Sequence, residues 1–338
     1  MDLPVYNGDM PMPAGLTWNW PRFALGVVFA LPGILVAPFA PTVGIALAIG
    51  VLPAAAYGLP ARRSKRALLP VVGALSAFGF LLGSLLTHIP VVAVAAMLIL
   101  SLLISLSTAR WAIGRLLLAL VLPMVGVGLS FSDTQTALVL SGFVVVGSAY
   151  AWIVSLLWPE RADPLSVATK TVRGADLVGY GILLGLASAT AAAIGYVFDL
   201  PQVGWATATV LFVMRPARDM VIKRSIGRAV SVFIGAIAAI AFSAIEPGGV
   251  LIGLLIAAAI GAMSAMQESR WYIAPAFTML VVMTLVLATW SPASVGRQFV
   301  AQSVETLIGV GLALTFGAAV PSLYAYLRVQ LSQRRDRG

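Results

Sequence analysis

The sequence contains no cysteine, a single histidine and few charged residues, and each scarcity excludes a class of protein. Without cysteine the chain can form no disulfide framework, metal–thiolate site or thiol nucleophile. Charged residues make up 10% of the chain, whereas a soluble globular domain carries about a quarter. No Gly-Lys-Ser/Thr phosphate-binding loop is present. These absences argue against a soluble enzyme, and we expect no cofactor and no metal site.

Long apolar runs dominate what is present. Apolar residues make up 60% of the chain, and a run of about 18 or more such residues is typical of a membrane-spanning helix. The runs are too long, and alternate too little, for the strands of a membrane barrel. We therefore predict an all-α integral membrane protein with twelve transmembrane helices. The predicted spans are 20–38, 42–59, 67–87, 90–107, 112–130, 135–158, 175–197, 202–217, 226–245, 249–266, 271–290 and 298–321.

Short sequence patterns recur in the same order about 160 residues apart, which indicates an internal repeat. Arg66 and Arg228 each precede Ala and, after five further residues, a Gly-Ala pair. Arg110-Trp111 recurs as Arg270-Trp271, and Pro41-Thr-Val-Gly recurs as Pro201-Gln-Val-Gly. Six spans per repeat is an even number, so both halves would insert in the same orientation. We therefore predict two parallel six-helix repeats, related by a pseudo-twofold axis along the membrane normal.

The predicted spans divide the chain into five parts. They are a cytoplasmic N-terminal segment (1–19), a first six-helix repeat (20–158), a cytoplasmic linker (159–174), a second six-helix repeat (175–321) and a basic cytoplasmic tail (322–338). No soluble domain is expected.

The distribution of basic residues predicts the orientation of the chain. If the N-terminus is cytoplasmic, twelve crossings place twenty of the twenty-one basic residues on the inner side and leave only Arg297 outside. The net charge of +9 is then a consequence of membrane topology, and no nucleic-acid partner is expected. We predict a multi-pass protein of the bacterial inner membrane with both termini in the cytoplasm and the lipid bilayer as its surroundings.

Glu305 is the clearest candidate for a functional residue, because an ionisable group inside a membrane is costly and rarely without a role. It follows Gln298 and Gln302 at spacings of four and three, which places the three side chains on one helical face. This stripe predicts a proton- or substrate-binding face, with Arg297 near its outer mouth. The alternative is that the stripe only joins helices through hydrogen bonds.

Further candidates are basic or aromatic residues. Arg66 and Arg228 are predicted at the inner ends of the third and ninth spans, where a facing pair would form a cationic constriction for anions; the alternative is snorkelling to the headgroups. Arg215 and Arg218 would gather organic anions at a cytoplasmic entrance or bind anionic lipids. Trp205 would stack on an aromatic ligand or pack in the interfacial belt.

The second half resembles a known family through several short motifs. They are Trp205-Ala-Thr-Ala-Thr209, then Arg215-Pro216, then Arg224-x3-Arg228-x6-Gly235, and finally Val304-Glu-Thr-Leu-Ile-Gly309. This pattern is similar to that of the fusaric acid resistance (FUSC) family, which is grouped with the aromatic acid exporters and the integral membrane bestrophin-like domain. The likeness extends over about 175–320. Ser231 and Val232 stand where the family usually has Gly-Thr.

The resemblance implies export of aromatic carboxylates or similar organic acids, driven by protons. Our leading hypothesis is therefore an inner-membrane, proton-coupled exporter of organic anions. A passive organic-anion channel is the second hypothesis. A non-transporting subunit of an envelope complex is the third, and a homo-oligomer or an envelope-complex partner is compatible with the sequence.

Overall fold

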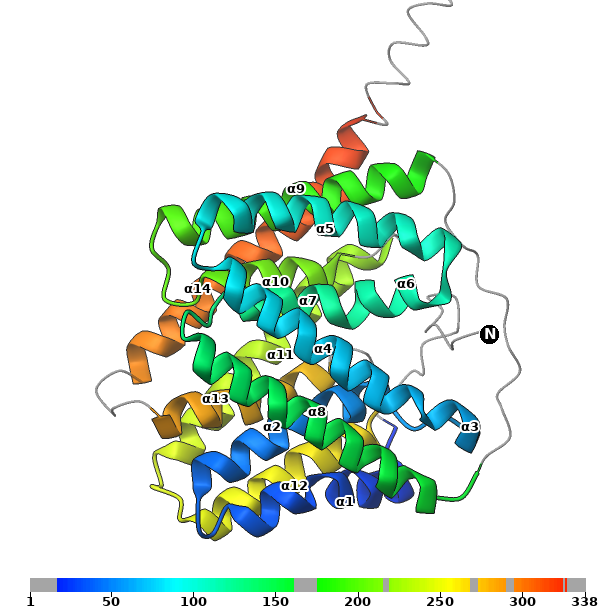
Figure 1. The fold of residues 1–338 in the computed structure, drawn as a ribbon. Helices are drawn as coiled ribbons and strands as arrows, with labels where there is room; N and C mark the ends of the chain where they lie inside the picture. Colours follow the sequence, from blue (N-terminus) through cyan, green and yellow to red (C-terminus); the bar gives the residue numbers. More distant parts are fainter. Residues whose placement is uncertain are drawn as a thin grey trace, which may run out of the picture.

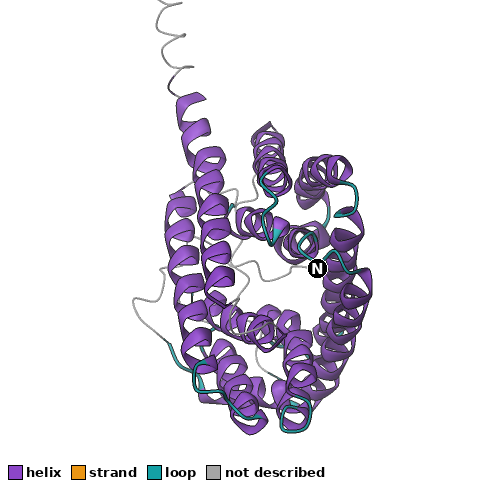
Figure 2. Cartoon of the chain, turned by 90° about the vertical axis from the view of Figure 1, so that its left-hand side faces the viewer, coloured by secondary structure: helices purple, strands orange, loops and turns teal. Residues whose placement is uncertain are grey.

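The computed structural model describes residues 17–160, 175–214, 219–267, 273–289, 295–324 and 326, and its regular elements are all helices (Figure 2). The prediction of an all-α chain is therefore confirmed for the described residues. The first half contains α1 (Trp20–Val36), α2 (Pro41–Tyr57), α3 (Arg63–Arg66), α4 (Leu68–Leu86), α5 (Pro90–Arg110), α6 (Ala112–Leu116), a π-helical segment (Leu117–Val121), α7 (Leu122–Gly128) and α8 (Thr134–Leu157). The second half contains α9 (Ala175–Val197), α10 (Val203–Val213), α11 (Asp219–Ser243), α12 (Gly249–Ala265), α13 (Ala274–Thr289), α14 (Val295–Leu314) and a π-helical segment (Thr315–Ala319).

Several helices begin at residues that suit a helix N-terminus. Pro41 and Pro90 occupy the first turns of α2 and α5, where the missing N–H leaves no hydrogen bond unmade. Asp133 caps α8 by accepting the backbone N–H groups of Gln135 and Thr136. Hydrogen bonds from the Thr136 side chain and from these two amides hold the pKa of Asp133 below its usual range. These local signals explain why the chain reverses direction where the apolar runs are interrupted.

Six helices of the described chain are long and apolar enough to cross a membrane. They are Arg63–Leu86, Pro90–Arg110, Thr134–Leu157, Asp176–Val197, Arg224–Ser243 and Val300–Tyr324. The shorter apolar helices are Trp20–Val36, Pro41–Tyr57, Ile113–Gly128, Val203–Val213, Gly249–Ala265 and Ala274–Leu285. Each of the twelve predicted runs coincides with one of these helices, although twelve crossings remain a prediction for the shorter ones.

The helices of the two halves pack in matching pairs. α1 lies along α12 at one edge of the molecule, and α5 lies along α9 at the opposite edge (Figure 1). In the first half α4 contacts α7 and α8, and α2 contacts α1 and α8. In the second half α11 contacts α13 and α14, and α10 contacts α9 and α14. Between the halves, α2 contacts α13 and α7 contacts α10. Each of these contacts has its counterpart when α1, α2, α4, α5, α7 and α8 are matched in order with α9 to α14.

Glycines bring equivalent helix pairs close together. A Cβ atom added at Gly147 of α8 would lie 2.5 Å from the carbonyl carbon of Gly50 in α2. A Cβ atom added at Gly309 of α14 would lie 2.6 Å from the carbonyl oxygen of Ala206 in α10. Such distances exclude any side chain without movement of the backbone. The α2–α8 and α10–α14 contacts are therefore built in the same way.

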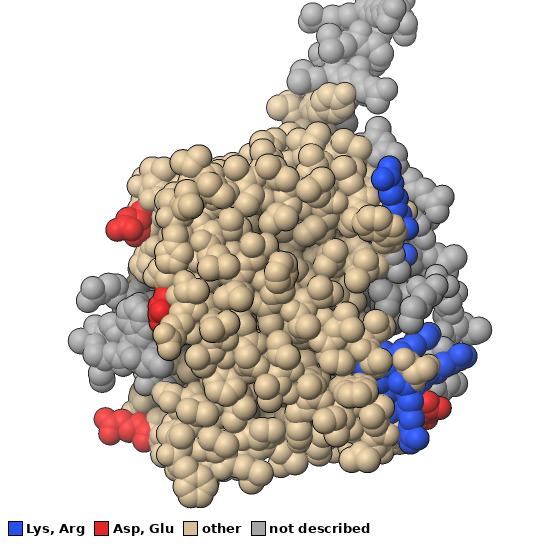
Figure 3. All heavy atoms as spheres, viewed as in Figure 1, with Lys and Arg blue, Asp and Glu red and all other residues tan. Residues whose placement is uncertain are grey.

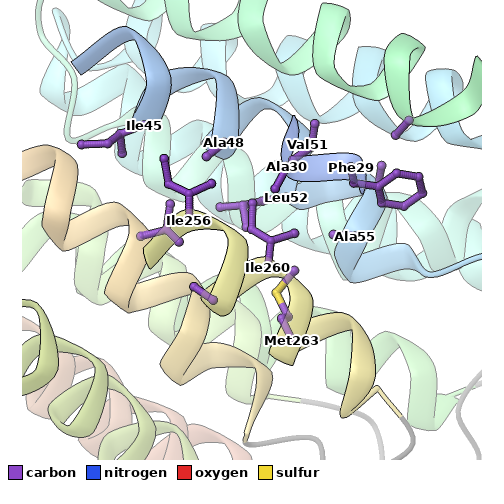
Figure 4. Close-up of a cluster of buried hydrophobic side chains, with 14 of the residues drawn as sticks. Phe29, Ala30, Ile45, Ala48, Val51, Leu52, Ala55, Ile256, Ile260 and Met263 are labelled. Atoms are coloured by element: carbon purple, nitrogen blue, oxygen red, sulfur yellow. The ribbon is translucent and has the colours of Figure 1, made fainter. Parts of the chain in front are cut away.

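The apolar interior at the α1–α2–α12 edge is shown in Figure 4. Phe29 from α1, Ile45 and Val51 from α2, and Ile256 and Ile260 from α12 are at most 2% exposed. Between membrane helices such a cluster is stabilised by close van der Waals packing rather than by removal of apolar surface from water. Since α12 belongs to the second half, this cluster joins the two halves.

Charged side chains separate to opposite ends of the helices. Lys and Arg gather at the end near α3 and α6, whereas Asp and Glu lie at the other end, apart from one acidic group beside the basic ones (Figure 3). At the basic end, Glu160 accepts the backbone N–H of Arg63. The face between the two ends carries no visible charge in this view, as expected of a surface that meets hydrocarbon.

Several helices differ in extent or regularity from the predicted spans. α11 begins at Asp219 rather than near residue 226, because its polar first turns remain helical beyond the apolar run. α10 ends at Val213, where Met214 adopts an extended conformation just before Arg215-Pro216. The fifth predicted span is one series of α6, a π-helical segment and α7. There the Leu122 N–H bonds to the Leu117 carbonyl immediately before Pro123, which itself has no N–H to donate.

Candidate functional site

Glu305 binds the N-terminus of a helix inside the protein. Its side chain on α14 is fully buried, and Oε1 accepts the backbone N–H of Gln202 at 2.9 Å. Gln202 is the N-cap residue of α10. The first turn of a helix has unpaired N–H groups and a partial positive charge, which stabilise an anion. The second carboxylate oxygen, Oε2, has no hydrogen-bond partner among the described residues.

The neighbouring polar residues of α14 are also inside the molecule. Gln302 is 2% exposed, and its Nε2 lies 3.7 Å from the sulfur of Met279 on α13. The Thr306 hydroxyl donates to the Gln302 carbonyl at 2.7 Å. Gln302 and Glu305 therefore face protein rather than lipid. Arg297 and Gln298 lie in the first turn of α14, but their side chains are outside the described part of the structure.

α10 carries several buried polar atoms without partners. Trp205, Thr207 and Thr209 are 8%, 0% and 0% exposed. Within the described residues, the Trp205 Nε1 and both threonine hydroxyls lack a hydrogen bond. Leaving one such group unsatisfied costs roughly 1–3 kcal/mol. Buried polar atoms of this kind call for a partner such as water, an ion or a ligand.

Arg228 lies at the other end of α10. Its side chain on α11 is 9% exposed, and its guanidinium carbon lies 4.8 Å from the centre of the Phe212 ring on α10. This distance allows a cation–π interaction. The Arg228 Nε atom has no hydrogen-bond partner among the described residues. The guanidinium therefore keeps hydrogen-bonding capacity that an anion can use.

These residues form one row, which we call the α10 seam and define as Glu305, Trp205, Thr209 and Arg228. Gln202, Trp205, Thr209 and Phe212 are spaced by three, four and three, so they share one face of α10. Ten residues of helix separate Gln202 from Phe212, or roughly 15 Å. The seam thus has a carboxylate at one end, a guanidinium at the other and unpaired donors between them.

The packing around the seam is tight. Trp205 packs against Val232 and Ala236 of α11 and against Met279 and Met283 of α13. Gly309 brings α14 onto α10, where an added Cβ atom would lie 2.7 Å from Cβ of Thr209. The seam is therefore enclosed by three helices of the second half.

Gly309→Ala should disturb the seam. The new methyl group must push α14 away from the Ala206 carbonyl, and overpacking of this kind costs about 1–3 kcal/mol. We expect a lower midpoint of thermal unfolding in detergent and slower transport. Gly311→Ala is the matched control, because a Cβ atom there would have no neighbour within 4 Å. Equal midpoints for the two variants would show that the α10–α14 contact is looser than described.

Arg66 has a different environment from Arg228, although the sequence repeat relates them. Its fully buried guanidinium donates to the carbonyls of Trp158 at 2.8 Å and Pro159 at 3.0 Å, and also to that of Ser155. Its Nε donates to the Pro60 carbonyl at 3.2 Å. These carbonyls lie at the C-terminal end of α8 and in the segment before α3. Arg66 therefore holds a helix end, and we carry the anion-facing role forward for Arg228 alone.

Two further predicted residues cannot be placed in this geometry. Arg215 and Arg218 lie outside the described residues. His88 is exposed, with Nε2 3.2 Å from the Thr134 hydroxyl. The described part of the chain contains no group of three His, Cys, Asp or Glu residues that could hold a metal ion.

The first half has no counterpart of the Glu305 carboxylate. If Gly147 is matched with Gly309, Phe143 stands where Glu305 stands in the second half. Phe143, Thr136 and Val139 of α8 line a groove with Thr42 and Val43 of α2. This groove is mainly apolar and lies away from the α10 seam. At this position the two repeats therefore share the same close helix contact but carry different side chains.

Sequence reasoning missed two partners of the seam. The Gln202 amide was not singled out, although Pro201-Gln202 directly before an apolar run is a recognisable helix start. Phe212 gives no signal in the sequence, because an aromatic residue in an apolar helix is ordinary.

Comparisons with known proteins bear on the second half. Residues 190–316 match the family model described as fusaric acid resistance protein-like. This range contains Glu305, Trp205, Thr209 and Arg228. No curated protein matches the chain, and no solved structure does. The finer likeness to aromatic acid exporters and to the bestrophin-like domain remains a prediction. With its long apolar helices the chain is a multi-pass membrane protein, and residues 190–316 are the part that is similar to the fusaric acid resistance protein-like family.

Proposed function

We propose that this protein is a transporter of the bacterial inner membrane that exports organic acid anions, aromatic ones among them, in a proton-coupled cycle. The observation that carries the proposal is the α10 seam. A buried carboxylate and a buried guanidinium lie at its two ends, and between them lie donors that have no partner within the described part of the chain. Ionisable groups in this setting are typical of proton relays and substrate pathways.

The depth of Glu305 supports this role. It lies ten residues into α14, roughly 15 Å along the helix. The apolar span of this helix begins at Val300, so Glu305 would lie inside the ~30 Å hydrocarbon core but nearer to one face than to the middle. A short helix that begins at this depth and points its N-terminus at an anion is a recurring feature of secondary transporters. In this proposal α10 is that helix.

The proposed architecture is twelve crossings in two parallel repeats. The helices α1, α2 and α12 have 17 residues each, which is at the lower limit for a spanning helix. The contacts between the halves occur in equivalent pairs, such as α1 with α12 and α5 with α9, which supports a pseudo-twofold axis along the membrane normal. The separation of basic and acidic ends supports a cytoplasmic location for the α3 and α6 end.

In the proposed cycle Arg228 attracts the anion at one end of the seam, and Glu305 carries the proton at the other end, roughly 15 Å along α10. Trp205 stacks on the ring of an aromatic substrate, and the Thr209 hydroxyl donates to it. Fusaric acid is itself an aromatic carboxylic acid, so the name of the matching family agrees with this chemistry.

Arg228→Gln should weaken anion transport. A hydrogen bond to a charged group contributes about 1.5–3 kcal/mol, which corresponds to roughly 10–100-fold in affinity. We expect KM for benzenesulfonate flux in proteoliposomes to rise by at least about tenfold. Arg228→Lys should be intermediate, because lysine keeps the charge but loses the planar contact with Phe212.

The matched control is Arg110→Gln, which removes an exposed arginine at the end of α5. Its KM should equal that of the wild type. An unchanged KM in Arg228→Gln would remove Arg228 from the substrate path.

A further inference from the structure

The N-terminus of α10 is already occupied by an anion, which is the carboxylate of the protein itself. Glu305 Oε1 accepts the Gln202 N–H. The Ser130 hydroxyl accepts the Gly204 N–H at 3.0 Å, and the Trp205 N–H is bonded to the Gln202 carbonyl at 2.9 Å. A second anion can therefore use the Gln202 N–H only if Glu305 gives it up.

The unpaired atoms of the site lie at this same helix end. Among the described residues the buried Oε2 of Glu305 has no hydrogen-bond partner, and neither has Nε1 of Trp205, a residue in the first turn of α10. An incoming carboxylate or sulfonate would find donors in the Gln202 N–H and the Trp205 Nε1–H. It would also lie beside the Glu305 carboxyl.

We propose that the substrate anion and one proton bind together here: the anion takes the Gln202 N–H from Glu305, and Glu305 takes up a proton from solution. This inference rests on the proposed function and determines whether the proton moves in the same direction as the anion or in the opposite direction. No covalent bond to the substrate is made or broken. The only transfer is a proton from water to the displaced carboxylate, which can then donate an O–H to the anion.

Electrostatics favours co-binding over exchange. Two carboxylates in contact repel strongly in a medium of low dielectric constant, so one of them is protonated. If Glu305 is protonated as the anion binds, the site holds one negative charge throughout. Before binding the charge is on Glu305, and afterwards it is on the anion. Exchange of a proton for an anion would instead leave two negative charges side by side at the helix end.

Among the ionisable groups around the site, Glu305 is the one whose protonation state would change when the anion binds. The helices with the most extensive contacts to α14 are α9, α10 and α11, and Met279 of α13 also lies against it. Residues 203–213 of α10 and 274–289 of α13 contain no ionisable group. Asp176 and Asp199 are exposed, whereas the hydroxyls of Tyr180 and Tyr196 are hydrogen-bonded to the Met214 carbonyl and the Thr87 hydroxyl. The remaining charged residues of these elements and of α14 are Asp219, Lys223, Arg224, Arg228 and Arg297.

Co-binding has a consequence for export. The proton and the anion cross in the same direction, so the cycle moves the equivalent of the neutral acid and follows the gradient of that acid. Accumulation of an organic acid lowers the cytoplasmic pH, and by reciprocity a lower pH raises the affinity for the anion. The site would therefore respond to the acid load that it removes.

Proton counting tests the inference. Purified protein in detergent is titrated with benzenesulfonate by calorimetry in two buffers of different ionisation enthalpy. This probe has no protonated form near neutral pH, so a proton taken up must go to the protein. We expect uptake of about one proton per anion, and an affinity that falls by up to about tenfold per unit rise in pH where Glu305 is ionised in the free protein. Glu305→Gln should bind with no linked proton, and Glu246→Gln, an exposed glutamate at the acidic end, should behave as the wild type.

Proton release, no linked proton in the wild type, or no binding of the probe would each overturn the inference. Uptake that persists in Glu305→Gln would also overturn it, because another group would then be responsible. Flux in proteoliposomes separates this failure from that of the proposed function. Flux without proton-linked binding would support the proposed transport function and refute the co-binding of proton and anion. Proton-linked binding without any flux would refute the proposed transport function and support the co-binding of proton and anion.

Discussion

Glu305→Gln should abolish the dependence of anion transport on a pH gradient. The amide has nearly the shape of the carboxylate, and its oxygen can still accept the Gln202 N–H, but it can neither carry a charge nor exchange a proton. Uphill accumulation of benzenesulfonate in proteoliposomes under an imposed pH gradient should fall to the level of protein-free vesicles. Downhill flux should continue. Glu246→Gln should keep full coupled transport.

The same substitution should leave the fold intact, which distinguishes a lost coupling group from a lost structure. A neutral amide costs less to bury than a carboxylate with one unpaired oxygen. We therefore expect the midpoint of thermal unfolding of Glu305→Gln to equal or exceed that of the wild type. Full coupled transport by this variant would refute the assignment of Glu305.

Arg66→Ala should have the largest effect on stability. The Arg66 guanidinium donates to four backbone carbonyls that lie at the end of α8 and before α3. Without it, carbonyls at a buried helix end have no donor, and each hydrogen bond to a charged group contributes about 1.5–3 kcal/mol. We expect a loss of roughly 3–5 kcal/mol in the free energy of unfolding, and poor recovery of folded protein from membranes.

Arg66→Lys should recover part of this loss, because an ammonium group can reach fewer of the four carbonyls at once. Arg63→Ala, at an exposed neighbouring position, is the control and should change stability little. Denaturant titration in mild detergent measures both. A wild-type stability for Arg66→Ala would mean that water replaces the guanidinium at this helix end.

The sequence predicted the helices well because hydrophobicity and proline act locally. Each apolar run became a helix, and the polar stripe of Gln302 and Glu305 lies inside the protein, as its spacing of three indicated. The apolar span predicted at 226–245 corresponds to Arg224–Ser243, but the helix itself begins at Asp219, since a charged segment continues a helix without being apolar. Arg228 lies in the third turn of α11 and near the beginning of its apolar span, Arg224–Ser243.

The partners of these residues could not be predicted, because they are distant along the chain. Glu305 meets an amide 103 residues away, and Arg66 meets carbonyls about 90 residues away. A hydrogen bond to a backbone N–H or carbonyl cannot be recognised from the identity of the residue that provides it. Equivalence by repeat was also misleading, because it suggested one role for Arg66 and Arg228. Arg66 donates to four carbonyls, whereas the Arg228 guanidinium lies over the Phe212 ring and its Nε has no partner among the residues that the structure describes.

The most direct test of the α10 seam as a coupled anion route is flux through the purified protein in proteoliposomes. Benzenesulfonate and a dicarboxylate are followed first under an imposed pH gradient and then under an imposed voltage. The account predicts uphill movement under the pH gradient, and loss of that movement in Glu305→Gln. Flux that follows voltage and ignores pH would contradict coupling and indicate a channel. Silence under both conditions would contradict transport and favour a subunit of a larger envelope complex.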